Sequence, residues 1–336
     1  MRGVCTFCSL VHVDSRKGLQ SAVTTQRRKG ATVTMYKRIL VPLDGSPLAE
    51  QILPAVEHLA SKLNTRVDLL SVVEEDVDAA VGTILRGRYR GKGPMGLVAI
   101  AENYLAERAD RMQLPEGQVQ RSVIKGSVAE AILKEASKRR DTLIAMSTHG
   151  RSGVGRFAMG SVADKVLHAT KMPLLLYRPG LNMFSLDAGE ISTVIVPLDG
   201  SELAEQVLPH VVELAAALPL KVLLVRVTSY PMAYYYGDEA PYLVPEDFSE
   251  ETEKEALKYL ALKAKELRKE GCQEVDTWHF IGTAAQQIID LAKETSQSFV
   301  ALTTHGRSGL GRWVLGSVAD RVIQQSGVPV LVIRAK

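Results

Sequence analysis

The sequence has few cysteines and no long apolar run. Its 336 residues include only 3 cysteines, too few for a disulfide framework, so we expect a reducing compartment. The most apolar stretch, residues 211–227, is interrupted by Glu213, Lys221 and Arg226. It therefore falls short of the roughly 18 apolar residues that predict a membrane span. The first residues also lack the pattern of a secretory signal peptide. Together these absences predict a cytoplasmic protein with no membrane partner.

The chain also lacks a strong excess of charge of either sign. Its formal net charge is +3 at pH 7, and residues 1–34 hold 6 basic side chains and 1 acidic one. That leaves 35 of the 41 basic and 37 of the 38 acidic side chains for the rest of the chain. Nucleic-acid binding needs Lys and Arg gathered on one face. This nearly neutral body therefore argues against a nucleic-acid partner.

A long internal repeat organises the chain. Residues 42–54 (PLDGSPLAEQILP) match residues 197–209 (PLDGSELAEQVLP) at 11 of 13 positions, 155 residues further on. Residues 148–166 match residues 304–322 at 14 of 19 positions, with an offset of 156. A repeat of about 150 residues has the size of a domain that folds alone. The sequence therefore predicts a duplicated domain.

We place the first copy at residues 35–180 and the second at residues 191–336, with a short linker between them and a disordered extension over residues 1–34. Within each copy, apolar β-branched runs such as TLIAM and PVLVI alternate with helical patterns. Strands covered by helices on both faces have this composition. The predicted fold class is α/β, with a doubly wound sheet of five parallel strands in each copy.

Start signals for several helices accompany this pattern. A single helix is expected over residues 47–63, with Ser46 as its N-cap and Pro47 in its first turn. Ser127 and Thr283 each precede a Glu or Gln by three residues, as in a capping box.

The strongest chemical signal is a glycine-rich loop before the last helix of each copy, at residues 150–161 and 306–317. Glycines allow backbone N–H groups to approach an anion, and a helix start adds a hydroxyl and the positive end of the helix dipole. The alternative is that Ser161 and Ser317 only cap their helices while the glycines supply turns. We expect capping in either case and favour a phosphate cradle in addition.

A carboxylate follows the first strand of each copy, in the segment VPLDGS. In an open α/β sheet, ligands bind beyond the carboxyl ends of the strands where the strand order reverses. Asp44 and Asp199 are therefore candidates to accept hydrogen bonds from ribose hydroxyls. Their alternative role is to shape the turn before Gly45 and Gly200.

From Met35 onward, both copies resemble the universal stress protein family, which has a doubly wound, Rossmann-like five-stranded sheet similar to that of adenine nucleotide α hydrolases. One branch of that family binds ATP through the motif Gly-x2-Gly-x9-Gly-Ser/Thr. The positions that match the motif are Gly150, Gly160 and Ser161 in the first copy and Gly306, Gly316 and Ser317 in the second. Ser147 and Thr303 replace the first motif glycine. A side chain there narrows the approach to ribose and phosphate.

The resemblance implies that ATP binds in one or both copies, with or without Mg²⁺, and that Asp44 and Asp199 hold its ribose. It places the adenine against Pro42, Leu43 and Val72, and against Pro197, Leu198 and Val227. It places the phosphates at Met146, Ser147, Gly150, Gly153, Gly160, Ser161 and Val162, and at Leu302, Thr303, Gly306, Gly309, Gly316, Ser317 and Val318. Each apolar residue could equally serve strand packing alone.

The resemblance further implies a regulatory nucleotide-binding protein of the stress response, with weak ATP hydrolysis at most, because the sequence presents no general base or metal cage. It also implies self-association, since the last strands, LLLYR and PVLVI, are apolar edges. They could pair within the chain as a pseudo-dimer or between chains as a dimer. The alternatives are a dimerising scaffold that binds no ATP and, on fold analogy alone, an adenylate-handling enzyme.

Three other motifs carry less weight. Residues 91–96 spell G-x-G-x-x-G, but no strand precedes them, as a dinucleotide site requires. Cys5, Cys8 and His12 supply only three zinc ligands. His149 and His305 recur in both copies without a partner acid or nucleophile placed by the sequence.

Overall fold

The computed structural model describes residues 35–74, 96–148, 159–178, 191–229, 246–304 and 315–335. The elements of the first copy are β1 (Arg38–Pro42), α1 (Pro47–Glu50), α2 (Leu53–Leu63), β2 (Arg66–Val73), α4 (Leu97–Arg111), β3 (Val119–Lys125), α5 (Val128–Ser137), β4 (Thr142–Ser147), α6 (Ser161–Ala169) and β5 (Leu174–Tyr177). Those of the second copy are β6 (Thr193–Pro197), α7 (Glu202–Glu205), α8 (Leu208–Ala217), β7 (Lys221–Thr228), α9 (Glu246–Lys269), β8 (Glu274–Ile281), α10 (Ala284–Glu294), β9 (Ser298–Thr303), α11 (Ser317–Gln325) and β10 (Val330–Ile333).

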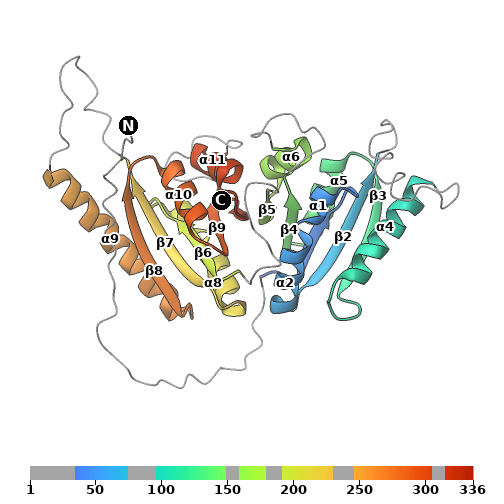
Figure 1. The fold of residues 1–336 in the computed structure, drawn as a ribbon, viewed down its shortest axis with the longest axis horizontal. Helices are drawn as coiled ribbons and strands as arrows, with labels where there is room; N and C mark the ends of the chain where they lie inside the picture. Colours follow the sequence, from blue (N-terminus) through green and yellow to red (C-terminus); the bar gives the residue numbers. More distant parts are fainter. Residues whose placement is uncertain are drawn as a thin grey trace, which may run out of the picture.

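These strands form one sheet across both copies (Figure 1). Its order is β3-β2-β1-β4-β5-β10-β9-β6-β7-β8. Neighbouring strands within each copy are parallel, as predicted. The two copies join where β5 pairs antiparallel with β10. The apolar last strands therefore pair inside the chain, which was one of the two arrangements left open by the sequence.

Helices cover both faces of the sheet and enclose two apolar cores. One core contains buried residues of α2, α4, α8 and α9 together with one face of the strands. The other contains buried residues of α5, α6, α10 and α11 together with the opposite face. Each core includes residues of both copies. The continuously apolar strands follow from this arrangement, because a strand covered on both faces has no polar side.

The helix expected over residues 47–63 is instead two helices, and this prediction was wrong. α1 ends at Glu50, and α2 begins at Leu53 with Pro54 in its first turn. Proline has no N–H to donate to the carbonyl four residues earlier, so a continuous helix would lose a hydrogen bond there. The second copy has the same break between α7 and α8, where Pro209 takes the place of Pro54.

The expected helix caps are only partly confirmed. Ser46 caps α1, since its Oγ accepts a hydrogen bond from the Ala49 N–H at 3.1 Å. Ser127 and Thr283 stand at N-cap positions, but neither side chain makes a cap hydrogen bond. Ser161 and Ser317 do not cap: each is the first helical residue, and the N-caps are glycines. Among the described residues, those two helix starts therefore have no side-chain cap.

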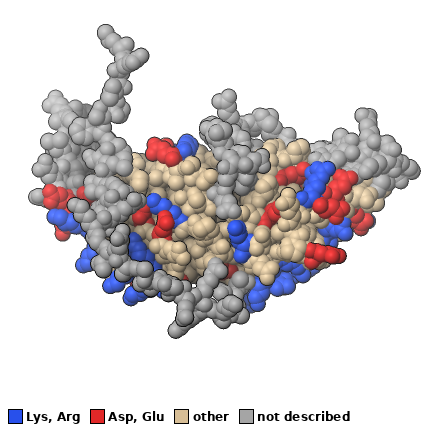
Figure 2. All heavy atoms as spheres, turned by 60° about the horizontal axis from the view of Figure 1, so that its bottom comes forward, with Lys and Arg blue, Asp and Glu red and all other residues tan. Residues whose placement is uncertain are grey.

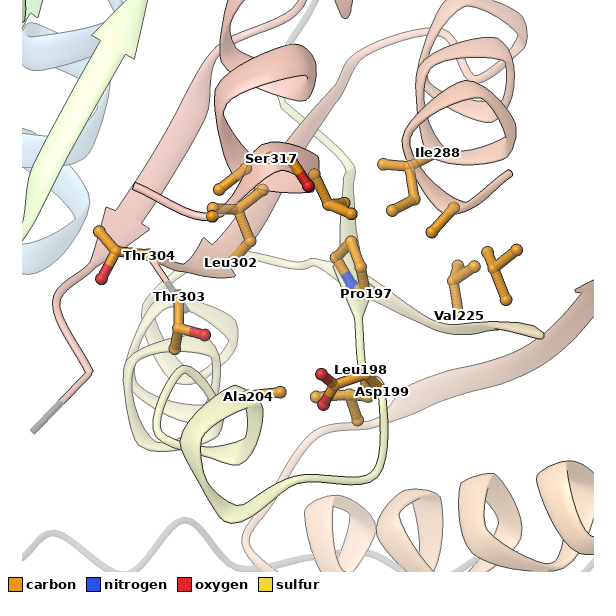
Figure 3. Close-up of a pocket in the computed structure, with 15 residues that line it drawn as sticks. Pro197, Leu198, Asp199, Ala204, Val225, Ile288, Leu302, Thr303, Thr304 and Ser317 are labelled. Atoms are coloured by element: carbon orange, nitrogen blue, oxygen red, sulfur yellow. The ribbon is translucent and has the colours of Figure 1, made fainter. Parts of the chain in front are cut away.

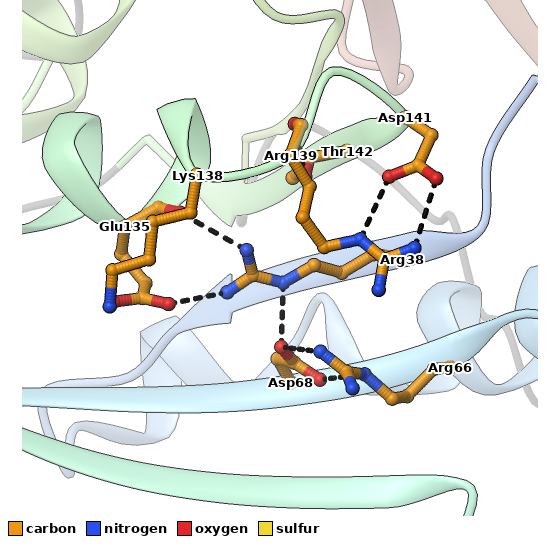
Figure 4. Close-up of polar contacts among 8 residues, drawn as sticks. All are labelled: Arg38, Arg66, Asp68, Glu135, Lys138, Arg139, Asp141 and Thr142. Carbon is orange, nitrogen blue, oxygen red and sulfur yellow. Dashed lines mark hydrogen bonds and ion pairs between the residues drawn. The ribbon is translucent and has the colours of Figure 1, made fainter.

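A buried ionic cluster joins β1, β2 and α5 at the amino end of the first copy's strands (Figure 4). Arg38 is 3% exposed. Its Nε donates to Asp68 Oδ2 at 2.6 Å, and its Nη2 lies 2.9 Å from Glu135 Oε1. Lys138 also pairs with Glu135, at 2.6 Å. Burial raises the pKa of Glu135, but the hydrogen bonds and charges of Lys138 and Arg38 outweigh it and leave that pKa below its usual value.

Charged side chains of both signs occupy the side of the molecule at the amino ends of the strands (Figure 2). Basic side chains follow the lower margin of that view, and acidic ones lie among and above them. Throughout the described ranges, every helix is either too short or too polar to cross a bilayer.

Candidate functional site

The strand order places a crevice at the carboxyl end of the sheet in each copy. β1 lies between β2 and β4, and β6 lies between β7 and β9. In each copy, the second and third strands therefore extend the sheet on one side of the first strand, and the fourth and fifth extend it on the other. The crossovers on the two sides run on opposite faces of the sheet, so the loops beyond the strand ends diverge and leave space for a ligand.

A pocket occupies this position in both copies, with volumes of about 130 Å³ in the first and about 220 Å³ in the second. Figure 3 shows the pocket of the second copy. The described residues predicted for the first site all line it: Pro42, Leu43, Asp44, Val72, Met146, Ser147, Gly160, Ser161 and Val162. Those predicted for the second site likewise line the other: Pro197, Leu198, Asp199, Val227, Leu302, Thr303, Gly316, Ser317 and Val318. Gly150, Gly153, Gly306 and Gly309 lie outside the described residues, as do the cysteine and histidine motifs.

The two pockets have equivalent walls, including residues that the sequence did not single out. In the first copy these are Ala49, Leu70, Val128, Ile132, Thr148 and Ala163. In the second they are Ala204, Val225, Ala284, Ile288, Thr304 and Ala319, which occupy the matching positions of the repeat. No sequence signal separates these wall residues from ordinary core residues, but once the wall of one pocket is known, the repeat offset gives the wall of the other. One side of each pocket is thus aliphatic and suits a flat apolar group.

The carboxylate in each pocket is fixed by the turn that follows it. Asp44 Oδ1 accepts the N–H of Ser46 at 2.9 Å. Asp199 Oδ1 accepts the N–H of Ser201 at 2.9 Å and its hydroxyl at 2.6 Å. Gly45, with φ +82°, allows the turn, because other residues rarely adopt that conformation. Both aspartates therefore shape the turns that follow them. The hydrogen bonds to Oδ1 in turn hold each half-buried carboxylate at the rim of its pocket.

The opposite rim is formed by the start of α6 in the first copy. The Asp164 N–H makes the first bond within the helix, to Gly160 O at 2.9 Å. The preceding N–H groups, those of Ser161, Val162 and Ala163, have no acceptor within the helix. The Gly160 N–H is already bonded to Thr148 O at 2.7 Å, which ties this rim to the end of β4. Uncapped N–H groups at a helix start favour an anion.

Gly160 and its equivalent Gly316 have φ values of −59° and −61°. Any residue adopts such backbone angles. What glycine contributes here is therefore the absence of a side chain, which leaves the backbone open to close approach.

The residues that replace the first motif glycine line the pockets without closing them. The Ser147 hydroxyl lies 3.5 Å from the Ala49 carbonyl, on the side of α1. Thr303 lies between Leu302 and α7, with its hydroxyl facing the pocket (Figure 3). Both pockets remain as cavities with these side chains present.

A buried hydroxyl in the first pocket has no acceptor or donor among the described residues. Thr148 follows β4 and is 3% exposed, and its Oγ1 makes no hydrogen bond within the described part of the chain. A buried polar group normally has a partner, because desolvation without one costs about 1 to 3 kcal/mol. This atom is thus a candidate contact for a polar ligand group.

A trio of side chains fixes the short helix that follows each carboxylate. In the second copy, Glu205 at the end of α7 accepts the Tyr259 hydroxyl at 2.8 Å and pairs with Lys263 at 2.9 Å. Burial and the Glu205 carboxylate raise the pKa of Tyr259 far above its ordinary value, which keeps the hydroxyl a donor. The first-copy equivalents are Glu50, Tyr104 and Arg108. Each trio anchors a pocket-lining helix to α9 or α4.

The described residues offer little else of catalytic type. His, Cys, Asp and Glu side chains form no group of three that could hold a metal ion within the described ranges. Asp44 and Asp199 are the titratable residues among the described lining of the two pockets. The arrangement can therefore hold a ligand with an apolar ring, hydroxyl donors and an anionic end.

Comparison with known proteins agrees with this architecture. The model of the universal stress protein family matches residues 35–178 and again residues 190–334. A universal stress protein of Bacillus subtilis is 32% identical over 145 residues, which span 42% of this chain and 97% of that protein. One from Synechocystis is 21% identical over 325 residues, spanning 89% of this chain and all of its own length.

A solved structure shows the same fold. A universal stress protein from Archaeoglobus fulgidus covers 89% of this chain and 98% of its own, with 20% identity and a TM-score of 0.60. An Arabidopsis thaliana family member solved with AMP bound covers 43% of this chain and 92% of its own, with 18% identity and a TM-score of 0.32. That likeness is too weak to assign a ligand here. From the two family matches along its length, the chain belongs to the universal stress protein family and carries the family domain twice in tandem.

Proposed function

We propose that each pocket binds ATP and that the chain acts as a regulatory nucleotide-binding protein of the stress response. The adenine would lie against the aliphatic wall, the ribose hydroxyls would donate to Asp44 or Asp199, and the phosphates would accept from the uncapped N–H groups of α6 or α11. The observation that carries the proposal is the duplication of the whole pocket, with the carboxylate and the uncapped helix start facing each other across an apolar wall in both copies.

The buried Thr148 hydroxyl supports this proposal, since a phosphate or ribose oxygen could supply the hydrogen-bond partner that the described residues do not. The same chemistry favours binding over turnover. The titratable group among the described lining of each pocket is one aspartate, and its Oδ1 is engaged in a turn. The bound nucleotide would then regulate the protein by binding and not by being hydrolysed. Any Mg²⁺ that takes part would be coordinated by the phosphates.

The second candidate is a scaffold that binds no ATP. The observation in its favour is the pair of side chains, Ser147 and Thr303, at the position of the first motif glycine. In this case the pockets would no longer bind a nucleotide, and the ten-stranded sheet would serve as a platform for partner proteins. A binding measurement separates the two candidates.

The test is equilibrium titration with ATP of the wild-type chain and of Gly160→Val, Gly316→Val and the double variant. We expect two sites in the wild type, one in each single variant and none in the double variant, with affinity at the altered site reduced about 100-fold or more, because a branched side chain occupies the space that the phosphates need. The backbone angles at both glycines suit valine, so the fold should persist.

Gly96→Val is the matched control. Gly96 is also a glycine at a helix N-cap position, before α4, with φ −67° and ψ 154°. A Cβ there would meet no described atom within 4 Å. This variant should bind two ATP molecules. A wild-type chain that binds no ATP at millimolar concentration would favour the scaffold instead.

A further inference from the structure

The junction between the copies has internal two-fold symmetry. Leu175 of β5 pairs with Leu331 of β10, and these residues are equivalent positions of the repeat, 156 residues apart. On either side, Leu174 pairs with Val332, the equivalent of Leu176, and Leu176 pairs with Val330, the equivalent of Leu174, so exchanging the two copies leaves the pairing unchanged. A contact made by one copy at this junction should therefore recur in the other, as in a symmetric dimer.

Two equivalent arginines make such a reciprocal contact. Arg178 follows β5, is 6% exposed, and its Nη1 donates to the carbonyl of Gln324 near the end of α11. Arg334 follows β10, and its Nη1 donates to the carbonyls of His168 at 3.2 Å and Thr170 at 2.9 Å, at the end of α6. Each arginine thus crosses the junction and binds the last helix of the other copy. The last carbonyls of a helix have no partner within it and attract cations.

These two helices are the ones that begin at the pockets. α6 starts at the rim of the first pocket and α11 at the rim of the second. Each is 9 residues long, so its start and its end are about 13 Å apart. A helix this short moves as a rigid rod, and a contact at its end helps to set where its N–H groups point at its start.

We propose that Arg334 positions the anion-binding end of α6 in the first pocket and that Arg178 positions that of α11 in the second, so that each copy sets the nucleotide affinity of the other. This inference rests on the proposed function, because it assigns these helix starts to the phosphates. Neither arginine lines the pocket that it supports. Both are positioning residues, and a ligand in one pocket is coupled to the opposite copy through them.

The test uses full-length chains with a single working site. In the Gly316→Val background, where only the first pocket binds, Arg334→Gln should weaken ATP binding about threefold to tenfold, a coupling of ordinary size. Arg178→Gln should leave that affinity unchanged. In the Gly160→Val background the effects should exchange, with Arg178→Gln weakening the second pocket and Arg334→Gln leaving it unchanged. Arg334→Lys, which keeps a cation at the end of α6, should restore part of the lost affinity.

Equal weakening of both pockets by either variant would overturn the inference, since general loosening of the junction predicts that result. Unchanged affinity in all four chains would also overturn it. Hydrogen exchange without nucleotide gives a second reading: Arg334→Gln should speed exchange in α6 and spare α11, and Arg178→Gln should do the reverse. If the single-site parents bind no ATP, the proposed function fails, and the exchange pattern alone decides whether the crossed support exists.

Discussion

Replacing Arg38 with methionine is expected to lower the free energy of unfolding by about 3 kcal/mol, as the loss of one partner from a buried ionic cluster does. Arg38 contacts Asp68 on β2 and both the carboxylate and the carbonyl of Glu135 on α5 (Figure 4). Without Arg38, two carboxylates that are mostly shielded from water lose the buried cation that they share. They keep pairs with Arg66 and Lys138, whose side chains are 41% and 59% exposed. Urea unfolding measures the change.

The second copy supplies a control for this prediction. Its equivalents of Arg38, Asp68 and Glu135 are Thr193, Leu223 and Leu291, which are all buried. The triple variant that places these three residues in the first copy should therefore lie within about 1 kcal/mol of the wild type, because apolar packing often replaces a buried ionic cluster without loss. A triple variant as unstable as Arg38→Met would contradict this account.

The same cluster predicts how the stability of the folded chain changes with pH. Because the pKa of Glu135 is lower in the folded chain than its usual value, its contribution to stability is present above its unfolded pKa. That contribution is lost as the pH falls through its folded pKa. The triple variant, which lacks this carboxylate, should lose less stability in acid than the wild type.

Replacing Leu331 with aspartate is expected to cost about 4 kcal/mol, the cost of a buried charge that has no partner. Leu331 is 1% exposed and lies at the centre of the β5–β10 pairing, where it lines a small apolar cavity of about 20 Å³ with Leu175 and Tyr36. No cation lines that cavity in the described chain. Thermal unfolding and the size of the chain in solution would report loss of the junction.

Leu262→Asp is the matched control, because Leu262 on α9 is 53% exposed. It should change stability by no more than about 0.5 kcal/mol. If Leu331→Asp fails to fold, Leu331→Ala should still cost about 3 kcal/mol through the cavity that it leaves. A wild-type melting temperature for Leu331→Ala would show that the junction contributes little to the fold.

The sequence predicted the fold class correctly because strands leave local signals, and the repeated segments pointed to the strand ends where the two pockets lie. Apolar runs locate β4 and β10, and the repeat identifies the two Asp-Gly turns. The sequence could not locate Leu70 or Ile132 in the pocket, since an aliphatic residue in the pocket wall looks the same in the sequence as one in the core. The break before α2 depends on one missing proline N–H, which a helical pattern of apolar residues conceals.

Contacts between distant residues left no signal at all. Arg38 lies 30 residues from Asp68 and 97 from Glu135. The Arg334 contact to the Thr170 carbonyl spans 164 residues. Such pairs form only once the sheet sets which strand ends meet. Ser161 was wrongly assigned as a cap because the sequence cannot say whether a helix begins at a serine or one residue after it.

The most direct test of the central claim is a crystal structure of the full chain grown with ATP. We expect one nucleotide in each pocket, with ribose hydroxyls within hydrogen-bonding distance of Asp44 and Asp199 and phosphates against the first N–H groups of α6 and α11. Nucleotide bound elsewhere on the chain, or both pockets filled only by water at saturating ATP, would contradict the account.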